Sequence, residues 1–149
     1  MEQAQLTIEE EEAQRLTDAA KQLIGRKRAQ KRLIPFAQSI DSTYEPYPVH
    51  HHIAERLEDV ESGRIRRLAI FVPPAIGKSR LSSEIFPAWV FGRNPKFEII
   101  AASYDDDLSR GFGRNVRNII KSPDYELVFP GVHVATDAHA MDAWGTNQE

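Results

Sequence analysis

Arg66-Arg67-Leu68-Ala69-Ile70-Phe71-Val72-Pro73-Pro74-Ala75-Ile76-Gly77-Lys78-Ser79 joins three patterns in one run of the chain. Leu68 to Val72 is an apolar run of strand-forming residues, two prolines follow it, and Gly-Lys-Ser then leads into a helical pattern. A strand, a loop that carries Gly-Lys-Ser and a helix form the context typical of a phosphate-binding loop. The run therefore predicts a nucleotide site at the start of the helix.

The predicted loop offers three kinds of contact to a nucleotide. A helix N-terminus presents unpaired N–H groups and a partial positive charge to an anion. Gly77 lets the backbone approach phosphate, Lys78 reaches the β- and γ-phosphates, and Ser79 holds Mg²⁺. The usual pattern begins with a glycine at the place where this chain has Val72. The alternative interpretation is an ordinary strand-to-helix turn with an exposed lysine.

Length and composition indicate one globular domain with a real core. The chain has 149 residues, of which 41% are hydrophobic and 28% charged, and its net charge is −3. That charge argues against a surface covered in DNA-binding residues, although local basic patches are allowed. Cysteine is absent, which excludes disulfides and thiolate metal sites. The acidic N-terminus argues against a signal peptide, and the lack of a long apolar run argues against a transmembrane helix. We therefore expect a cytoplasmic location.

Residues 1–43 are expected to form an N-terminal helical extension. Thr7 with Glu10 reads as a capping box, and a helix is predicted from Ile8 to Ile34, with Gly25 as a weak point. Acidic residues begin this helix and basic residues end it, an order that suits the helix dipole. The basic end could contact nucleic acid or a partner protein, but a solvated helix end is the more usual case.

The next stretch is predicted to be a connection followed by a second helix. Phe36 to Pro48 is expected to cross the surface without regular structure, and a helix is predicted from Val49 to Glu61, with Gly63 as its stop. The triplet His50-His51-His52 suggests a metal site. However, three successive residues of a helix cannot all face one point, which argues against it.

The segment after Ser79 is predicted to complete a βαβ unit. Leu81, Ile85 and Trp89 recur every four residues and mark a buried helix face, which Pro87 should kink or end near Phe86. A second apolar strand is predicted at 97–103. The expected fold is therefore α/β, with a parallel βαβ core like that of P-loop NTPases, preceded by N-terminal helices.

The last predicted helix combines an acidic start with a basic stripe. Asp105 or Asp106 is expected to cap a helix that runs from about Asp106 to Lys121. Metal binding by this acidic run is the less favoured alternative. A stripe at helical spacing could follow a phosphate backbone or simply face water: Arg110, Arg114, Arg117 and Lys121. A further short strand is possible at 131–135.

The order of several short motifs resembles the large subunit of tailed-bacteriophage terminases, over roughly residues 44–147. These motifs are Tyr-Pro-x-His-His, Glu-Ser-Gly-Arg-Ile-Arg-Arg-Leu, Phe-Val-Pro-Pro-x-x-Gly-Lys-Ser, Phe-Pro-Ala-Trp, Gly-Arg-Asn-Pro, Ala-Ser-Tyr, Phe-Gly-Arg-Asn-Val-Arg and Ser-Pro-Asp-Tyr. Such subunits are DNA-packaging motors with an N-terminal ATPase domain and a C-terminal nuclease domain. The resemblance implies a partial ATPase domain of terminase type (RecA-like) at 44–149, in a phage- or prophage-encoded protein of the bacterial cytoplasm.

The resemblance also implies the cofactors ATP and Mg²⁺ and a set of residues that bind them. The implied loop begins at Pro73, and Ser79 would reach Mg²⁺. The implied nucleotide-binding residues are Pro74, Ala75, Ile76, Gly77, Lys78, Ser79 and Arg80. Tyr47 and His50 to His52 would lie where such ATPases contact adenine, and Ser103 and Tyr104 would support the site. The implied partners are double-stranded DNA, the procapsid portal, the terminase small subunit and further copies of the full-length protein.

Two departures from the family pattern limit the expected activity. Many relatives carry a basic residue in the loop where this chain has Ala75 and Ile76. In addition, no apolar strand ending in paired acids follows Trp144, so the residues that hold Mg²⁺ and position water are missing, as are the nuclease carboxylates. We therefore expect the front part of a terminase that binds ATP but hydrolyses it poorly, with no assigned catalytic residue. The alternatives are a non-enzymatic nucleotide- or nucleic-acid-binding fragment and another helicase-like P-loop ATPase.

Overall fold

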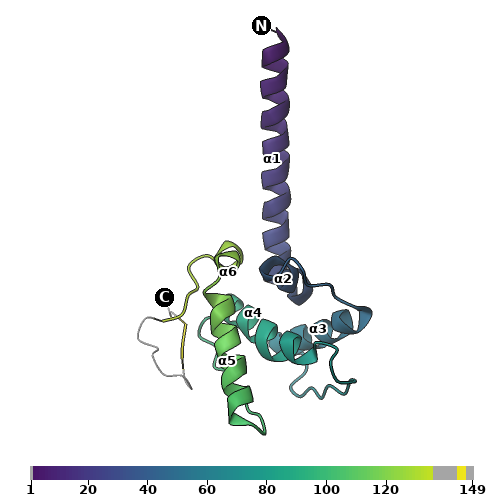
Figure 1. The fold of residues 1–149 in the computed structure, drawn as a ribbon, viewed down its shortest axis with the longest axis vertical. Helices are drawn as coiled ribbons and strands as arrows, with labels where there is room; N and C mark the ends of the chain where they lie inside the picture. Colours follow the sequence, from purple (N-terminus) through teal and green to yellow (C-terminus); the bar gives the residue numbers. More distant parts are fainter. Residues whose placement is uncertain (1, 136–143, 147–149) are drawn as a thin grey trace.

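The structure, a computed structural model, describes residues 2–135 and 144–146, with the backbone alone at 2–10. In these ranges one long helix stands clear of a body built from shorter helices and loops (Figure 1). The helices in chain order are α1 (Glu2–Lys31), α2 (Leu33–Ile40), α3 (Pro48–Glu61), the π-helix η1 (Arg80–Ile85), α4 (Phe86–Arg93), α5 (Asp106–Ile120) and α6 (Pro123–Val128). None of them is both long and apolar enough to cross a membrane.

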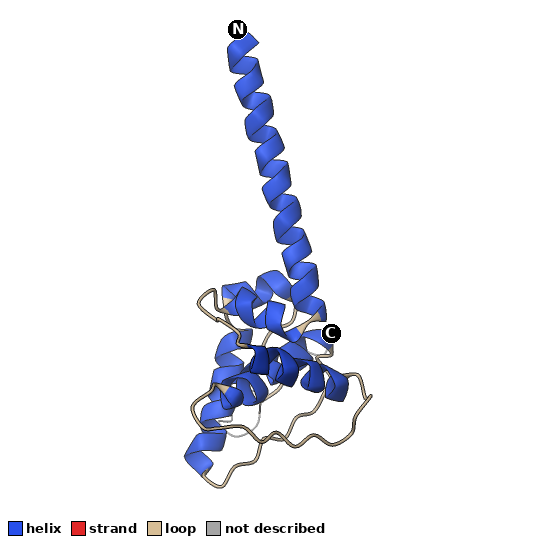
Figure 2. Ribbon diagram, turned by 90° about the vertical axis from the view of Figure 1, so that its right-hand side faces the viewer, coloured by secondary structure: helices blue, strands red, loops and turns tan. Residues whose placement is uncertain are grey.

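The expected parallel βαβ core is wrong, because the described ranges contain helices and loops but no strand (Figure 2). The predicted strands at 68–72 and 97–103 are irregular, and no backbone hydrogen bond joins them. A strand is stable only when a neighbouring strand pairs with its N–H and C=O groups, and strand propensity alone does not supply one. The alternation of buried and exposed side chains that a strand would show remains in part of the first run. Ile70 and Val72 pack against the core, while Phe71 between them is 92% exposed.

The possible strand at 131–135 is reduced to one isolated antiparallel bridge between Val134 and Thr146. The N–H of Ala135 donates to the carbonyl of Gly145 at 2.9 Å beside it. This single bridge ties the segment after α6 to the described residues near the C-terminus without forming a sheet.

The N-terminal prediction placed the helix boundaries wrongly. Helix α1 begins at Glu2, so Thr7 lies inside it and is not an N-cap, and Gly25 does not interrupt it. The break comes at Arg32, whose extended backbone (φ −135°, ψ 136°) separates α1 from α2. The first turn of α2 contains Pro35, a place where proline is tolerated because its missing N–H has no helical partner there.

The expected connection at 36–48 is partly wrong as well, because α2 occupies its first part and supplies the core. Phe36 is fully buried, with its ring centroid 5.9 Å from that of Tyr125 and 5.6 Å from that of Phe129. Helix α3 begins one residue before the predicted start and ends at Glu61 as predicted, followed by Gly63 at φ +73°.

The helix after Gly77 has the predicted buried face, since Leu81, Ile85 and Trp89 are at most 1% exposed. Pro87 does not end it, and helical winding continues to Arg93. The turns before Pro87 instead form the wider π-helix η1. At its end the N–H of Phe86 donates a hydrogen bond to the carbonyl of Leu81, five residues earlier. A wider turn accommodates a proline ring that would crowd the preceding carbonyl of a regular α-helix.

Helices α5 and α6 complete the body. The carboxylate of Asp105 accepts from the N–H of Leu108 at 3.1 Å and caps α5 as predicted, while α6 was not foreseen as a helix. One core joins the elements, with these buried apolar residues: Ala29, Leu33, Ile34, Phe36, Ala37, Ile53, Ala54, Leu57, Leu81, Ile85, Ala88, Trp89, Val90, Val116, Ile120, Tyr125, Val128 and Phe129.

Candidate nucleotide-binding site

The loop before η1 reverses direction through two left-handed residues. Ala75 has φ +64° and Gly77 has φ +83°. Gly77 adopts this conformation without cost, whereas alanine loses roughly 1–2 kcal/mol there because its Cβ approaches the following carbonyl. Pro73 and Pro74 precede the turn and fix their own φ angles. The loop is therefore a strained, preformed turn.

Helical winding begins directly after this turn, at Lys78. The carbonyl of Gly77 accepts the first helical hydrogen bond, from the N–H of Leu81 at 3.1 Å. The N–H groups of Lys78, Ser79 and Arg80 belong to the first turn, where a helix has no internal partners for them. These donors and the positive end of the helix dipole are the features that bind phosphate in proteins.

The side chains at the loop are compatible with an anionic ligand. Within the described residues Lys78 forms no ion pair with a carboxylate, and Gly77 and Ser79 are exposed. A Cβ added at Gly77 would find only His50 Nε2 nearby, at 3.6 Å, so the loop is open on its outer side. Backbone N–H donors and an ammonium group are ligands that phosphates bind, and a hydroxyl can supply one oxygen to a nucleotide-bound Mg²⁺. These residues therefore fit the phosphate-binding part of an ATP site.

His50 connects the loop to helix α3. Its Nδ1 accepts from the backbone N–H of Tyr47 at 3.0 Å, so the ring proton is on Nε2, which donates to the carbonyl of Ile76 at 2.6 Å. His50 is 5% exposed, and its ring centroid lies 5.9 Å from that of Tyr44 and 5.7 Å from that of Tyr47. The segment expected to approach adenine is thus bonded to the expected phosphate loop.

Arg80 is committed to another contact. Its guanidinium pairs with the carboxylate of Asp41, the C-cap residue of α2. Hydrogen bonds from the hydroxyl and N–H of Thr43 hold the pKa of Asp41 below its ordinary value, and the charge of Arg80 adds to that effect. The ion pair anchors the helix that follows the loop to α2, and it gives Arg80 a structural partner within the chain.

Tyr44 brings a buried hydroxyl close to the same place. Within the described residues its Oη is buried without a hydrogen-bond partner. Burial raises the pKa of this hydroxyl, and the nearby charge of Arg80 partly offsets the rise. A buried donor without a partner next to the loop is a polar group that a ligand or a water molecule could satisfy.

The histidine triplet does not form a metal site. Among the described residues, no three His, Cys, Asp or Glu side chains lie close enough together to hold a metal ion. His50 is buried whereas His51 and His52 are exposed, as the geometry of successive helical residues requires. The acidic run that starts at Asp105 caps α5 instead of gathering around an ion.

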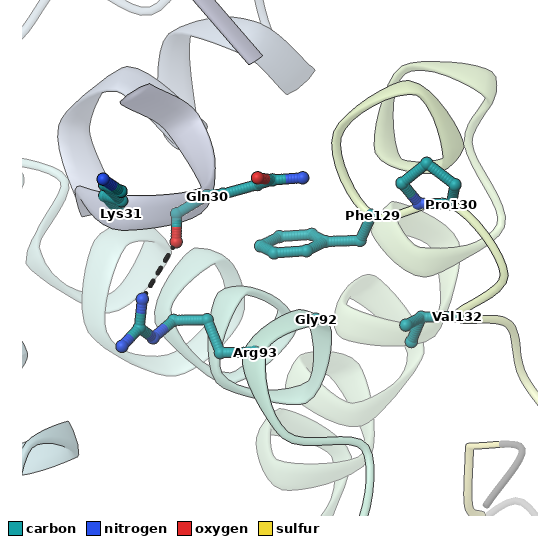
Figure 3. A pocket seen from close by; sticks show the side chains of 7 residues that line it. All are labelled: Gln30, Lys31, Gly92, Arg93, Phe129, Pro130 and Val132. Atoms are coloured by element: carbon teal, nitrogen blue, oxygen red, sulfur yellow. Dashed lines mark hydrogen bonds between the residues drawn. The ribbon is translucent and has the colours of Figure 1, made fainter. Parts of the chain in front are cut away.

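A hollow of about 490 Å³ lies away from the loop, between the end of α1, the end of α4 and the segment after α6 (Figure 3). The polar groups beside it bond to one another. Gln30 Nε2 donates to the carbonyl of Val128 at 2.6 Å, and Arg93 donates to the carbonyl of Gln30 at 3.1 Å. Arg93 also pairs with Glu61 at 2.8 Å and lies 4.7 Å above the ring of Trp89. None of the predicted nucleotide ligands lines this hollow.

The basic stripe of α5 is unevenly placed. Arg110 pairs with Asp106 at 2.9 Å, and Arg117 is half-buried. Arg114 and Lys121 are exposed. Three of the four cations are therefore exposed, and one of these three, Arg110, is paired with a carboxylate.

The sequence did not reveal the structural roles of His50, which was expected only near adenine, and of Asp41, although both hold the loop in place. A signal for His50 existed in the sequence, because a histidine three residues after Tyr47 can bond back to that backbone N–H at a helix start. No local pattern links Asp41 to Arg80, 39 positions away.

Comparisons with protein-family models, with curated proteins and with solved structures found no match for this chain.

Proposed function

We propose that the chain binds the phosphates of ATP·Mg²⁺ on the loop from Pro73 to Ser79. The observation that carries the proposal is the turn at Ala75 and Gly77, which leads directly into the first turn of a helix beginning at Lys78. Unpaired N–H groups of that turn would bind the phosphates, Lys78 would neutralise their charge, and Ser79 would reach the metal ion.

The proposal takes its biological setting from the resemblance to terminase large subunits. In that setting the chain is the ATP-binding front part of a motor that packages viral DNA, and double-stranded DNA, the portal, the small subunit and further copies are its proposed partners. We propose that residues 1–149 on their own hydrolyse ATP near background, because no counterpart of the family's paired acids lies within them.

The contact between His50 and Ile76 supports the proposal from a second element. A carbonyl held at 2.6 Å by a buried imidazole cannot rotate freely, so the adjacent N–H groups of the loop keep their direction. A preformed anion site loses less conformational entropy on binding than a flexible loop does.

Calorimetric titration with ATP and Mg²⁺ tests the site. We expect Lys78→Ala to weaken binding by about 1.5–3 kcal/mol, or roughly tenfold to a hundredfold, because it removes a charge-assisted contact to phosphate. Lys121→Ala instead removes the exposed lysine at the C-cap of α5 and should leave the heats unchanged.

Equal heats from the wild type and Lys78→Ala would contradict the site assignment. Phosphate release measured on the same samples tests hydrolysis separately. Rapid turnover that Lys78→Ala abolishes would keep the nucleotide site but contradict slow hydrolysis.

A further inference from the structure

The part of α1 that projects from the body carries an uncovered apolar stripe. From Glu11 to Gly25, here called the arm, every residue is exposed, and partial burial begins at Arg26. Helix α1 projects away from the body (Figure 1). Leu16 is 71% exposed and Leu23 is 54% exposed. The arm extends about 22 Å at the usual rise of a helix. An isolated helix of this length is marginal in water, so packing against a partner would stabilise it.

The stripe has the spacing of a coiled-coil seam. Ala13, Leu16, Ala20 and Leu23 follow one another at intervals of three, four and three residues, so they share one face of the helix. The polar contacts of the arm lie on the opposite face, where Arg15 pairs with Glu11 and Lys21 pairs with Asp18. One face is thus satisfied within the helix, and the other is left for a partner.

We propose that the arm pairs with the same arm of a second copy of this chain, in antiparallel orientation. This orientation sets Leu16 against Ala20 of the second copy and Ala13 against Leu23, so each layer joins a large side chain with a small one. Such alternation lets two helices approach closely and fill the space between them.

Charge complementarity favours the antiparallel orientation. It places Glu12 opposite Arg26 of the second copy at both ends of the seam, with Ala19 facing Ala19 at the two-fold axis. Within the described residues neither Glu12 nor Arg26 forms an ion pair of its own. A parallel pair would set Lys27 against Lys27 and would leave Glu12 beside Thr17, which bears no charge.

The interface is short, so the proposed association is weak. The seam comprises two apolar layers on each side of the axis and ends near Arg26, where each helix meets its own body. It therefore belongs with transient contacts rather than with obligate dimers. The proposal is independent of the nucleotide site, because none of these residues lies near the loop from Pro73 to Ser79.

A disulfide at the axis tests the orientation. The chain has no cysteine, so Ala19→Cys places a single thiol at the proposed axis, and Gln22→Cys places one on the outer face as a control. Under mild oxidation we expect Ala19→Cys to form a covalent dimer at least tenfold faster than Gln22→Cys. Equal rates for the two variants would overturn the proposal.

Charge reversal tests the same pairing without a covalent bond. Sedimentation velocity over a range of concentrations should show roughly tenfold weaker association for Glu12→Arg or Arg26→Glu alone, because each replaces two attractions with two repulsions. An equal mixture of the two variants should regain the affinity of the wild type, since both facing pairs are again opposite in charge. A mixture no stronger than either variant, or a wild type that stays monomeric at the highest concentration, would overturn the proposal.

Discussion

Gly92 stands in the last turn of α4 with the ring of Phe129 against its Cα. A Cβ added there would lie 2.3–2.5 Å from three ring carbons, closer than any real contact. Gly25 also lies inside a helix, α1, but a Cβ added at that position would meet nothing within 4 Å. The same substitution therefore has opposite consequences at the two sites.

We expect Gly92→Ala to lower the free energy of unfolding by about 1–3 kcal/mol, because the core must shift to admit the methyl group. Gly25→Ala is the matched control and should raise the helix content of α1, since alanine is favoured over glycine by about 1 kcal/mol inside a helix. Urea unfolding measures the first effect and far-UV circular dichroism the second. A wild-type unfolding free energy for Gly92→Ala would contradict the packing described.

Two side-chain contacts fix the segment around the candidate loop between helices. His50 of α3 holds the carbonyl of Ile76 on one side of the turn, and Asp41 at the end of α2 holds Arg80 on the other. Helix η1 lies between this anchored start and Pro87, where its wide turns give way to α4. The position of the loop is therefore set by α2 and α3 rather than by a sheet.

The contacts of Asp41 make part of this anchoring dependent on pH. Hydrogen bonds from Thr43, and the charge of Arg80, keep the pKa of the folded carboxyl below its ordinary value of 3.8. A lowered pKa contributes stability that is complete above the ordinary value and is lost as pH falls below it.

We expect the difference in unfolding free energy between the wild type and Asp41→Asn to be largest near neutral pH and to shrink below about pH 4. Arg80→Gln should have the smaller effect, since Thr43 is the larger cause of the shift. Urea unfolding at a series of pH values provides the measurement. A difference that grows as pH falls would reverse the sign and contradict the assignment.

At the scale of the whole molecule, the chain consists of a packed body and an unsupported arm. Trp89 reports on the body, because it is 1% exposed and its Nε1 donates to the carbonyl of Ala29 at 3.0 Å. Residues 11–25 have no such contacts with the body. A helix without tertiary packing melts gradually, whereas a core melts cooperatively.

We therefore expect two probes to give different melting curves in dilute solution. The helical signal in far-UV circular dichroism should fall gradually, beginning at low temperature. The fluorescence of Trp89 should change sharply at a higher temperature, and it is measured in a Trp144→Phe variant so that Trp89 is the only tryptophan. Gly25→Ala should shift only the gradual part. Coincident curves from both probes would contradict an independent arm.

Local patterns in the sequence determined most of the helices. Apolar spacing located α3 and α5, and it identified Leu81, Ile85 and Trp89 as the buried face of the helix after the loop. These predictions succeed because a helix bonds within one segment, so that periodicity and caps carry enough information. The Gly77-Lys78 pair likewise predicts the start of the helix that follows the loop.

Tertiary structure alone decided what happens to the apolar runs at 68–72 and 97–103. A strand needs backbone partners from elsewhere in the chain, and strand propensity cannot say whether they are present. In the described residues these runs stay unpaired, while Phe36, Tyr125 and Phe129 from α2 and the α6 region pack their rings together in the core. The contacts of His50 with Ile76 and of Asp41 with Arg80 join distant positions in the same way, which is why folding, and not local pattern, shaped the candidate site.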